Sequence, residues 1–69
     1  MTNNKSNLRN EYLLKRREKR ITQKAIADYI GISNSAISKY ERGNIDLIDT
    51  YVNKYKKFID EYQNQIIKT

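Results

Sequence analysis

The 69-residue chain has no cysteine, no histidine, no proline and no tryptophan, and it has only two glycines, Gly31 and Gly43. Without cysteine the chain can form neither a disulfide nor a thiolate metal site. Without histidine it lacks the commonest general base, metal ligand and pH switch. It also has no glycine-rich phosphate loop and no evident pair of catalytic carboxylates. We therefore expect no metal, no cofactor and no enzymatic activity.

Long hydrophobic runs are also missing. No apolar stretch approaches the roughly 20 residues that a membrane span requires, and no signal-peptide core follows the basic start of the chain. We expect a soluble, cytoplasmic protein with no membrane partner. A chain of this length favours one small domain, which we place at residues 7–69 after a flexible N-terminus of residues 1–6.

Positive charge is in excess and unevenly spread. The chain carries 14 basic and 8 acidic side chains, a net charge of +6. Residues 1–24 hold eight basic and two acidic side chains, whereas residues 25–69 hold six of each. A small basic domain of this kind favours a polyanionic partner, either a nucleic acid or a membrane surface.

The spacing of apolar residues and helix signals predicts a chain that is nearly all helix. Residues 7–19 are strong helix formers, and Arg20 follows where a helix-ending glycine would be expected. The apolar anchors of this first helix are Leu8, Tyr12, Leu13 and Leu14.

Two short helices follow. Thr22 and Ser33 are typical N-cap residues, and Gly31 and Gly43 stand where helices end. We therefore predict helices at residues 23–30 and 34–42, and such a pair joined around a glycine is a helix-turn-helix signature. Their inward residues are Ile26, Ala27, Ile30, Ala36, Ile37 and Tyr40.

A longer amphipathic helix is predicted at residues 47–66, with Asp46 as its N-cap. At about 1.5 Å per residue it is longer than the other helices can cover. Its apolar face either folds back and completes a monomer core or forms a dimer interface, and the two interpretations stay open. The interface residues would be Tyr51, Tyr55, Phe58, Ile59, Tyr62 and Ile66.

The stretch "ITQKAIADYIGISNSAISKYERG" (residues 21–43) resembles the Cro/C1-type helix-turn-helix of the lambda repressor-like (XRE) family. The matching positions are Thr-Gln, Ile-Ala, Gly-Ile-Ser, Ile-Ser and Glu-x-Gly. The resemblance implies an all-α domain of four to five helices with a long C-terminal helix. It also implies a regulator of phage, plasmid or bacterial origin that binds double-stranded DNA, most often as a repressor on a palindromic operator.

The same resemblance places residues 34–42 in the DNA major groove. The spacing puts Asn34, Ser35, Ser38 and Lys39 on one side of that helix, and the resemblance implies that they read bases. An asparagine amide can pair with the N6 and N7 edge of adenine, and a lysine can reach guanine O6 or N7. Implied contacts to the DNA backbone come from Thr22, Gln23, Lys24, Ser33, Arg42 and Asn44.

Family members also join an arginine of the first helix to a glutamate at the end of the reading helix. Here the resemblance implies an Arg16–Glu41 ion pair, with Arg17 as the alternative register. Lys15 and Arg20 depart from the family pattern, which has leucine and glycine or asparagine there.

A homodimer is the partner that we expect for the last helix, because it would place two reading helices about one DNA turn apart on a palindrome. The alternative is an antitoxin-like or accessory regulator whose C-terminal helix binds a different protein.

Overall fold

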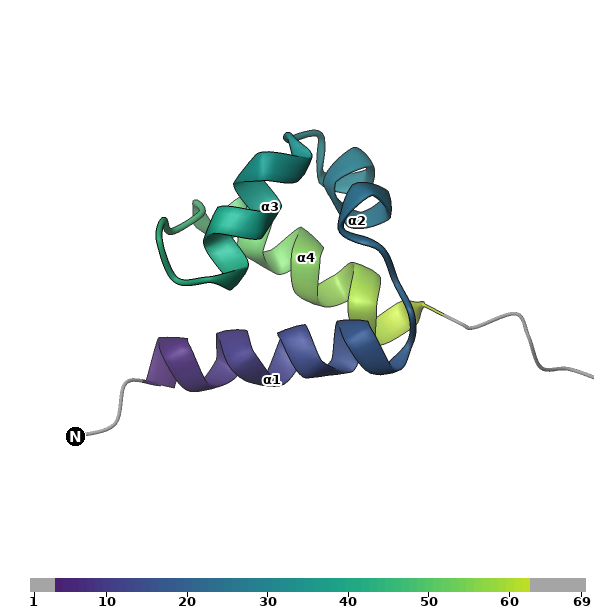
Figure 1. Ribbon diagram of the computed structural model, residues 1–69, viewed down its shortest axis with the longest axis horizontal. Helices are drawn as coiled ribbons and strands as arrows, with labels where there is room; N and C mark the ends of the chain where they lie inside the picture. The colour runs from purple at the N-terminus through teal and green to yellow at the C-terminus, as the bar shows by residue number, and fades with distance from the viewer. Residues whose placement is uncertain (1–3, 63–69) are drawn as a thin grey trace, which may run out of the picture.

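The computed structural model describes residues 4–62, which form four α-helices and no strand. They are α1 (Asn4–Glu18), α2 (Gln23–Ile30), α3 (Asn34–Glu41) and α4 (Asp49–Glu61). Helix α1 runs along one side of the molecule, α2 and α3 lie together on the opposite side, and α4 passes between them (Figure 1). The prediction of an all-α fold with four to five helices is thus confirmed for the described residues. Within the described part, none of the helices combines the length and hydropathy that a membrane crossing requires.

Both short helices begin at the predicted caps. Thr22 Oγ1 accepts a 3.0 Å hydrogen bond from the Ala25 amide, and Ser33 Oγ accepts one of 3.0 Å from the Ala36 amide. Each hydroxyl oxygen therefore satisfies one of the amides that a helix start leaves without a partner. The two helices start where the sequence predicts because their boundaries depend on local chemistry.

The first three helices end in the same kind of left-handed turn. Among residues 4–62, those with positive φ are Arg20 (61°), Gly31 (92°) and Gly43 (80°). After each of them, the next amide donates back to a carbonyl five residues earlier, as in a Schellman motif. These bonds are Ile21 N to Arg16 O, Ile32 N to Ala27 O and Asn44 N to Lys39 O. Arg20 thus adopts a conformation that favours glycine.

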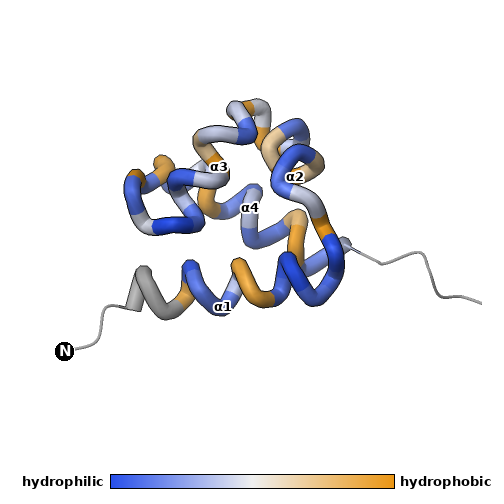
Figure 2. The backbone as a smooth tube through the Cα atoms, in the orientation of Figure 1, coloured by the Kyte–Doolittle hydropathy of each residue, from blue (hydrophilic) through white to orange (hydrophobic). Residues whose placement is uncertain are grey.

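The core lies where α2, α3 and α4 meet. Hydrophobic and hydrophilic residues are interspersed along the helices (Figure 2), and eight of the hydrophobic ones form a buried cluster. The rings of Tyr40 and Tyr55 meet edge to face with centroids 5.3 Å apart, a favoured aromatic geometry. The buried hydrophobic residues are Ile21, Ile26, Ala27, Ile30, Ile37, Tyr40, Tyr55 and Ile59.

Helix α1 differs from the prediction in its start and in its buried face. It begins at Asn4, so residues 4–6 belong to the helix that was expected to start at residue 7. Leu8 is 42% exposed and Leu14 is 60% exposed, so neither is a core anchor. The side that packs inward carries Tyr12 and Arg16, four residues apart. Leu14 lies about half a helical turn from that side and meets solvent.

Helix α4 starts later than predicted. Its first residue is Asp49, and its N-cap is Ile48, which makes no side-chain capping bond. The predicted cap, Asp46, instead accepts a 2.7 Å hydrogen bond from Arg9 Nη2. Asp46 is therefore held toward α1, three residues before the helix begins, and the prediction that it caps α4 was wrong.

The end of α4 is also earlier than residue 66. The helix stops at Glu61, and the Lys19 ammonium donates to the carbonyls of Ile59 (2.6 Å), Asp60 (3.3 Å) and Tyr62 (3.3 Å). A cation at this end satisfies free carbonyls and complements the helix dipole. Ile66 lies outside the described residues.

Two of the expected dimer-interface residues belong to the monomer core instead. Tyr55 and Ile59 are both 0% exposed within a single chain, so they are unavailable to a second copy. Tyr51, Phe58 and Tyr62 are half-buried and pack at the edge of the core. These two residues are buried because α4 passes between the other helices, which cover the middle of its apolar stripe.

Candidate nucleic-acid interface

Helix α3 has one buried and one exposed side. Ile37, Tyr40 and Glu41 are buried at 0%, 5% and 6% exposure. Lys39 is exposed on the opposite side, and Asn34 is exposed because it is the first residue of the helix. Ser35 is exposed next to Asn34 in the first turn. The helix thus offers short polar side chains and one long cation to solvent while its other side is fixed to the core.

Ser38 is in a different situation from the other residues predicted to read bases. It is half-buried, and its Oγ accepts a 2.7 Å hydrogen bond from Arg42 Nη1. Arg42 is the C-cap residue of α3 and is exposed. The serine therefore positions an arginine at the end of the helix, four residues further along.

A buried polar network holds α3 to the rest of the molecule. Arg16 binds the Glu41 carboxylate with two bonds, from Nε to Oε2 at 2.6 Å and from Nη2 to Oε1 at 2.9 Å. The same carboxylate accepts from Gln23 Nε2 at 2.9 Å and from the Tyr55 hydroxyl at 2.7 Å. Arg16 Nη1 also donates to the Ile21 carbonyl at 2.7 Å. One carboxylate therefore joins α1, α2 and α4 to α3.

This network fixes the register of the ion pair. Arg16 makes the pair, whereas Arg17 is exposed. A bidentate guanidinium–carboxylate pair is a strong and directional interaction. Buried charges of this kind destabilise a fold unless every group is satisfied, and here both carboxylate oxygens accept two hydrogen bonds each.

The protonation states of the network follow from these contacts. Burial raises the pKa of Glu41, but the hydrogen bonds from Arg16, Gln23 and Tyr55 outweigh it and leave that pKa below its ordinary value. Burial, together with the bond to Glu41, raises the pKa of Tyr55 well above its usual range. At neutral pH the carboxylate is thus ionised and the phenol is protonated.

Four of the six residues expected at the DNA backbone lie at the starts of α2 and α3, and the other two, Arg42 and Asn44, lie at the end of α3. Thr22 and Ser33 are exposed caps. Gln23 is half-buried and gives one amide hydrogen to Glu41, so only its second hydrogen is left for another acceptor. Lys24 forms a 3.2 Å pair with Asp28 in which both side chains are largely exposed, and such a pair holds the lysine only weakly.

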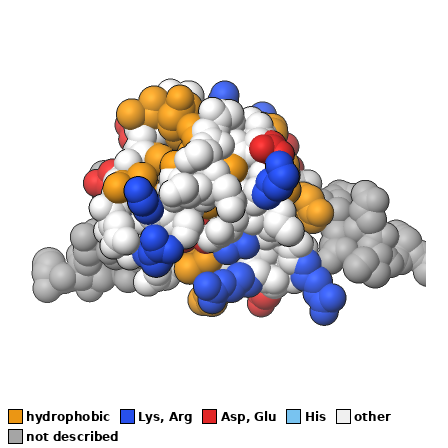
Figure 3. All heavy atoms as spheres, turned by 45° about the horizontal axis from the view of Figure 1, so that its top comes forward, with side chains coloured by type: hydrophobic (Ala, Val, Ile, Leu, Met, Phe, Trp, Pro, Cys, Tyr) orange, Lys and Arg blue, Asp and Glu red, His pale blue; other side chains and the backbone are white. Residues whose placement is uncertain are grey.

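Basic side chains surround this part of the surface. With the α2–α3 side turned toward the viewer, lysine and arginine side chains lie around a mostly uncharged centre (Figure 3). The exposed basic residues on these helices or in the turns that flank them are Arg20, Lys24, Lys39 and Arg42. Asn44 is exposed just after α3, and its backbone amide donates to Lys39 O at 2.9 Å.

Comparison with protein families agrees with this geometry. The family model for helix-turn-helix proteins of the Cro/C1 type matches residues 5–55. The chain belongs to this helix-turn-helix family. The family is a DNA-binding regulatory one, and the chain is thus a DNA-binding helix-turn-helix regulator. Comparisons with curated proteins and with solved structures gave no match.

The matched range of the regulator extends from α1 to Tyr55, so it contains every side chain of the Glu41 network. Sequence reasoning found Arg16 and Glu41 but missed the bonds from Gln23 and Tyr55. The family pattern places Gln23 at the DNA backbone and gives no bond to Glu41. Tyr55 was counted as an apolar residue of α4, because periodicity treats the phenol ring as hydrophobic and ignores its hydroxyl. No signal in the sequence pairs Tyr55 with Glu41, which lies 14 positions earlier on another helix.

The two departures from the family pattern also have structural explanations. Lys15, where the family has leucine, lies with its ammonium 4.6 Å from the Tyr12 ring centroid and 3.4 Å from Asp60 Oδ1. A half-buried lysine stem can replace leucine there because its charged end reaches partners at the surface. Arg20 takes the left-handed conformation itself.

Proposed function

We propose that this regulator is a repressor that binds a palindromic operator as a homodimer, with α3 in the major groove. One observation carries the proposal: α3 is fixed by its buried side, and it presents Ser35 and Lys39 to solvent on the other side and Asn34 at its exposed start. Helices of this kind read base edges with short polar and cationic side chains.

The role that we propose for each side chain follows from its position on the surface. Asn34 in the first turn reads adenine, Lys39 reads guanine or holds a phosphate, and Ser35 makes a less selective contact. Ser38 acts mainly through Arg42, which it positions at the end of α3. The caps Thr22 and Ser33, with the free amides behind them, bind phosphates together with Lys24 and Asn44.

Selection of bound sites from random DNA with the purified full-length protein tests this function. We expect an enriched sequence with two-fold symmetry and half-sites about one DNA turn apart. Affinity for that site should fall steeply as salt rises, because each neutralised phosphate releases counterions. Failure to enrich any sequence at low salt would refute sequence-specific binding, and a single asymmetric half-site would refute the homodimer.

The surface offered to a second protein chain lies where α2 meets α4. Tyr29 is 46% exposed and stacks on Phe58 at 4.8 Å, and Phe58 contacts Tyr62 at 5.6 Å. We assign this cluster to the homodimer. The alternative function, an accessory regulator that binds a different protein, uses the same cluster. Sedimentation of the purified chain separates the two, because a monomer at high micromolar concentration would favour the alternative.

A further inference from the structure

The turn after α3 carries Arg42 and Asn44, two of the residues that the proposed function assigns to DNA phosphates. The backbone supports the first half of this turn, because the Gly43 amide donates to Tyr40 O at 3.0 Å and the Asn44 amide to Lys39 O at 2.9 Å. The second half, residues 45–48, has no such support. Within the described part of the chain, the amides of these four residues donate no backbone hydrogen bond.

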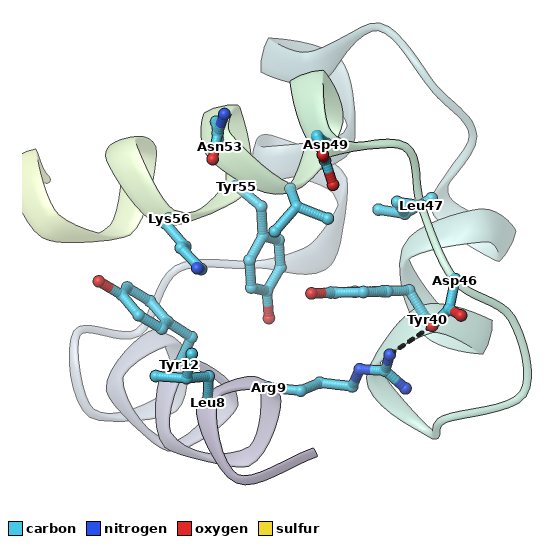
Figure 4. Close-up of a pocket in the computed structure, with 11 residues that line it drawn as sticks. Leu8, Arg9, Tyr12, Tyr40, Asp46, Leu47, Asp49, Asn53, Tyr55 and Lys56 are labelled. Atoms are coloured by element: carbon cyan, nitrogen blue, oxygen red, sulfur yellow. Dashed lines mark hydrogen bonds and ion pairs between the residues drawn. The ribbon is translucent and has the colours of Figure 1, made fainter. Parts of the chain in front are cut away.

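One side chain of α1 contacts the chain before, within and after this turn. The guanidinium carbon of Arg9 lies 4.6 Å from the centroid of the Tyr40 ring. A Cβ added at Gly43 would lie 3.4 Å from Arg9 Nη1, so the guanidinium lies directly against the turn. Arg9 Nη2 donates a 2.7 Å hydrogen bond to Asp46 Oδ1. Figure 4 shows Arg9 extending from α1 to Asp46 beside the Tyr40 ring.

The two members of this ion pair differ strongly in burial. The Arg9 side chain is only 12% exposed, whereas that of Asp46 is 72% exposed. Arg9 Nε is fully buried and has no hydrogen-bond partner in the described part of the chain. The guanidinium therefore depends on Asp46 for an acceptor, and a buried charged donor that loses its acceptor is costly. Without Asp46 we expect Arg9 to move toward water and to release the turn.

Other contacts of the second half of the turn are few. Leu47 packs at the edge of the hydrophobic core, whereas Ile45 and Ile48 are 37% and 62% exposed. The bond between Arg9 and Asp46 thus joins a segment with little packing to a helix that begins the fold. Because one partner is exposed, the pair contributes little to global stability, and its effect is local.

We propose that Arg9 is a positioning residue for DNA binding. Through Asp46 it holds the turn after α3 in the conformation that brings Arg42 and Asn44 to the phosphates. The part of this role that concerns DNA rests on the proposed function, whereas the hold on the turn does not. Electrostatics alone predicts the opposite effect of Asp46, because a carboxylate near the turn repels phosphates and its removal would strengthen binding.

The sign of the Asp46→Ala effect on DNA affinity therefore tests the proposal. The probe is a duplex of random sequence, which requires neither an operator nor two-fold symmetry. We expect binding about threefold to tenfold weaker, and a plot of log affinity against log salt that is shallower by about 1, because a phosphate contact is lost. Circular dichroism verifies that the variant is folded. Unchanged or tighter binding would overturn the proposal.

Asp49→Ala is the matched control. It removes the same charge three positions later, from an exposed side chain that forms no ion pair among the described residues. We expect unchanged or slightly tighter binding, and a loss equal to that of Asp46→Ala would overturn the proposal. Arg9→Met combined with Asp46→Ala should bind no more weakly than the weaker single variant, because both changes break one interaction.

Hydrogen exchange without DNA tests the hold on the turn by itself. In Asp46→Ala the Asn44 amide should exchange at least about fivefold faster than in the original chain, while the amides of α2 keep their rates. An unchanged rate at Asn44 would overturn the role of Arg9. Failure of the proposed function has a different sign: Arg42→Gln would leave the affinity for random DNA unchanged.

Discussion

The hydroxyl of Tyr55 on α4 donates a 2.7 Å hydrogen bond to Oε2 of Glu41 at the end of α3. The tyrosine is completely buried, and the glutamate is 6% exposed. The other polar contacts of α4 lie near its C-terminal end, where Asp60 accepts from Tyr12 at 2.7 Å and the Ile59 carbonyl accepts from Lys19 at 2.6 Å. This bond gives α4 a defined orientation relative to α3.

Replacing Tyr55 with phenylalanine should destabilise the fold by about 1–3 kcal/mol, because a hydrogen bond to a buried charge is lost while the ring remains. Urea unfolding at neutral pH, followed by circular dichroism, measures the loss. The matched control is Tyr51→Phe on the same helix. Tyr51 is half-buried and its side chain makes no hydrogen bond among the described residues, so we expect a change within about 0.5 kcal/mol. Equal losses in the two variants would contradict a role for the hydroxyl.

Stability should fall in acid partly through Glu41. Its pKa in the folded chain lies below the ordinary value of 4.5, so the unfolded chain binds protons more readily. The stabilisation is thus present above about pH 4.5 and is lost as the pH falls through the folded-state pKa. Glu41→Gln should be less stable at neutral pH, by about 3–5 kcal/mol, because it leaves the Arg16 charge buried without its counter-ion.

The difference in unfolding free energy between the original chain and Glu41→Gln separates the contribution of Glu41 from those of the other carboxyl groups. Unfolding free energies of the original chain and of Glu41→Gln, measured from pH 7 to pH 3, should converge as the pH falls below about 4.5. A constant difference over the whole range would show that Glu41 does not titrate in that window.

Arg20→Gly should stabilise the fold by about 1 kcal/mol. The residue has a φ of 61°, a conformation that costs a residue with a side chain about 1–2 kcal/mol. Glycine removes this cost. Part of the stabilisation is lost again because glycine gives the unfolded chain more conformational freedom. Arg20→Ala is the control, because it removes the charge but keeps Cβ. Thermal unfolding of both variants should show a gain for glycine alone, and a gain of the same size for alanine would assign the effect to charge instead.

Asn34→Ala should change DNA recognition without changing the fold. We expect a loss of about 1–3 kcal/mol on the selected operator and little loss on random DNA, because one base contact is removed. Fluorescence titration on both DNAs makes the comparison. Equal loss on the two would rule out a reading role for this side chain.

Gln23→Ala is the matched comparison at the start of α2. It should weaken binding to the operator and to random DNA alike, because a phosphate contact carries no sequence information. It should also lower stability by about 1 kcal/mol, since the amide donates to Glu41 at 2.9 Å. Unchanged stability would mean that this bond is not maintained in solution.

The helix-turn-helix could be predicted from the sequence because its signals are local. Thr22 and Ser33 cap the helices that they precede, and Gly31 and Gly43 end them. Each of these residues acts on backbone groups within a few positions of itself, so the surrounding fold has little influence on the outcome. The pairing of Arg16 with Glu41 came from the family pattern rather than from the residues alone.

The outer helices could be predicted less well because their faces depend on tertiary contacts. Hydrophobicity selects Leu14 as an anchor, yet Arg16 is buried in its place because Glu41 needs a cation. Asp46 is a residue type typical of an N-cap, but its side chain binds Arg9, 37 positions earlier, instead of capping α4. Apolar periodicity located the stripe of α4 correctly. It could not tell that Tyr55 and Ile59 would be covered by the chain's own core.

The Glu41 network touches every helix but none of the exposed side chains of α3. Asn34, Ser35 and Lys39 lie outside it. Substitutions at these three positions therefore leave the framework intact, whereas a change at position 41 disturbs four helices together. If these side chains read bases as proposed, a few codons at the surface would set the preferred DNA sequence, while the codons of the buried network would keep the fold unchanged.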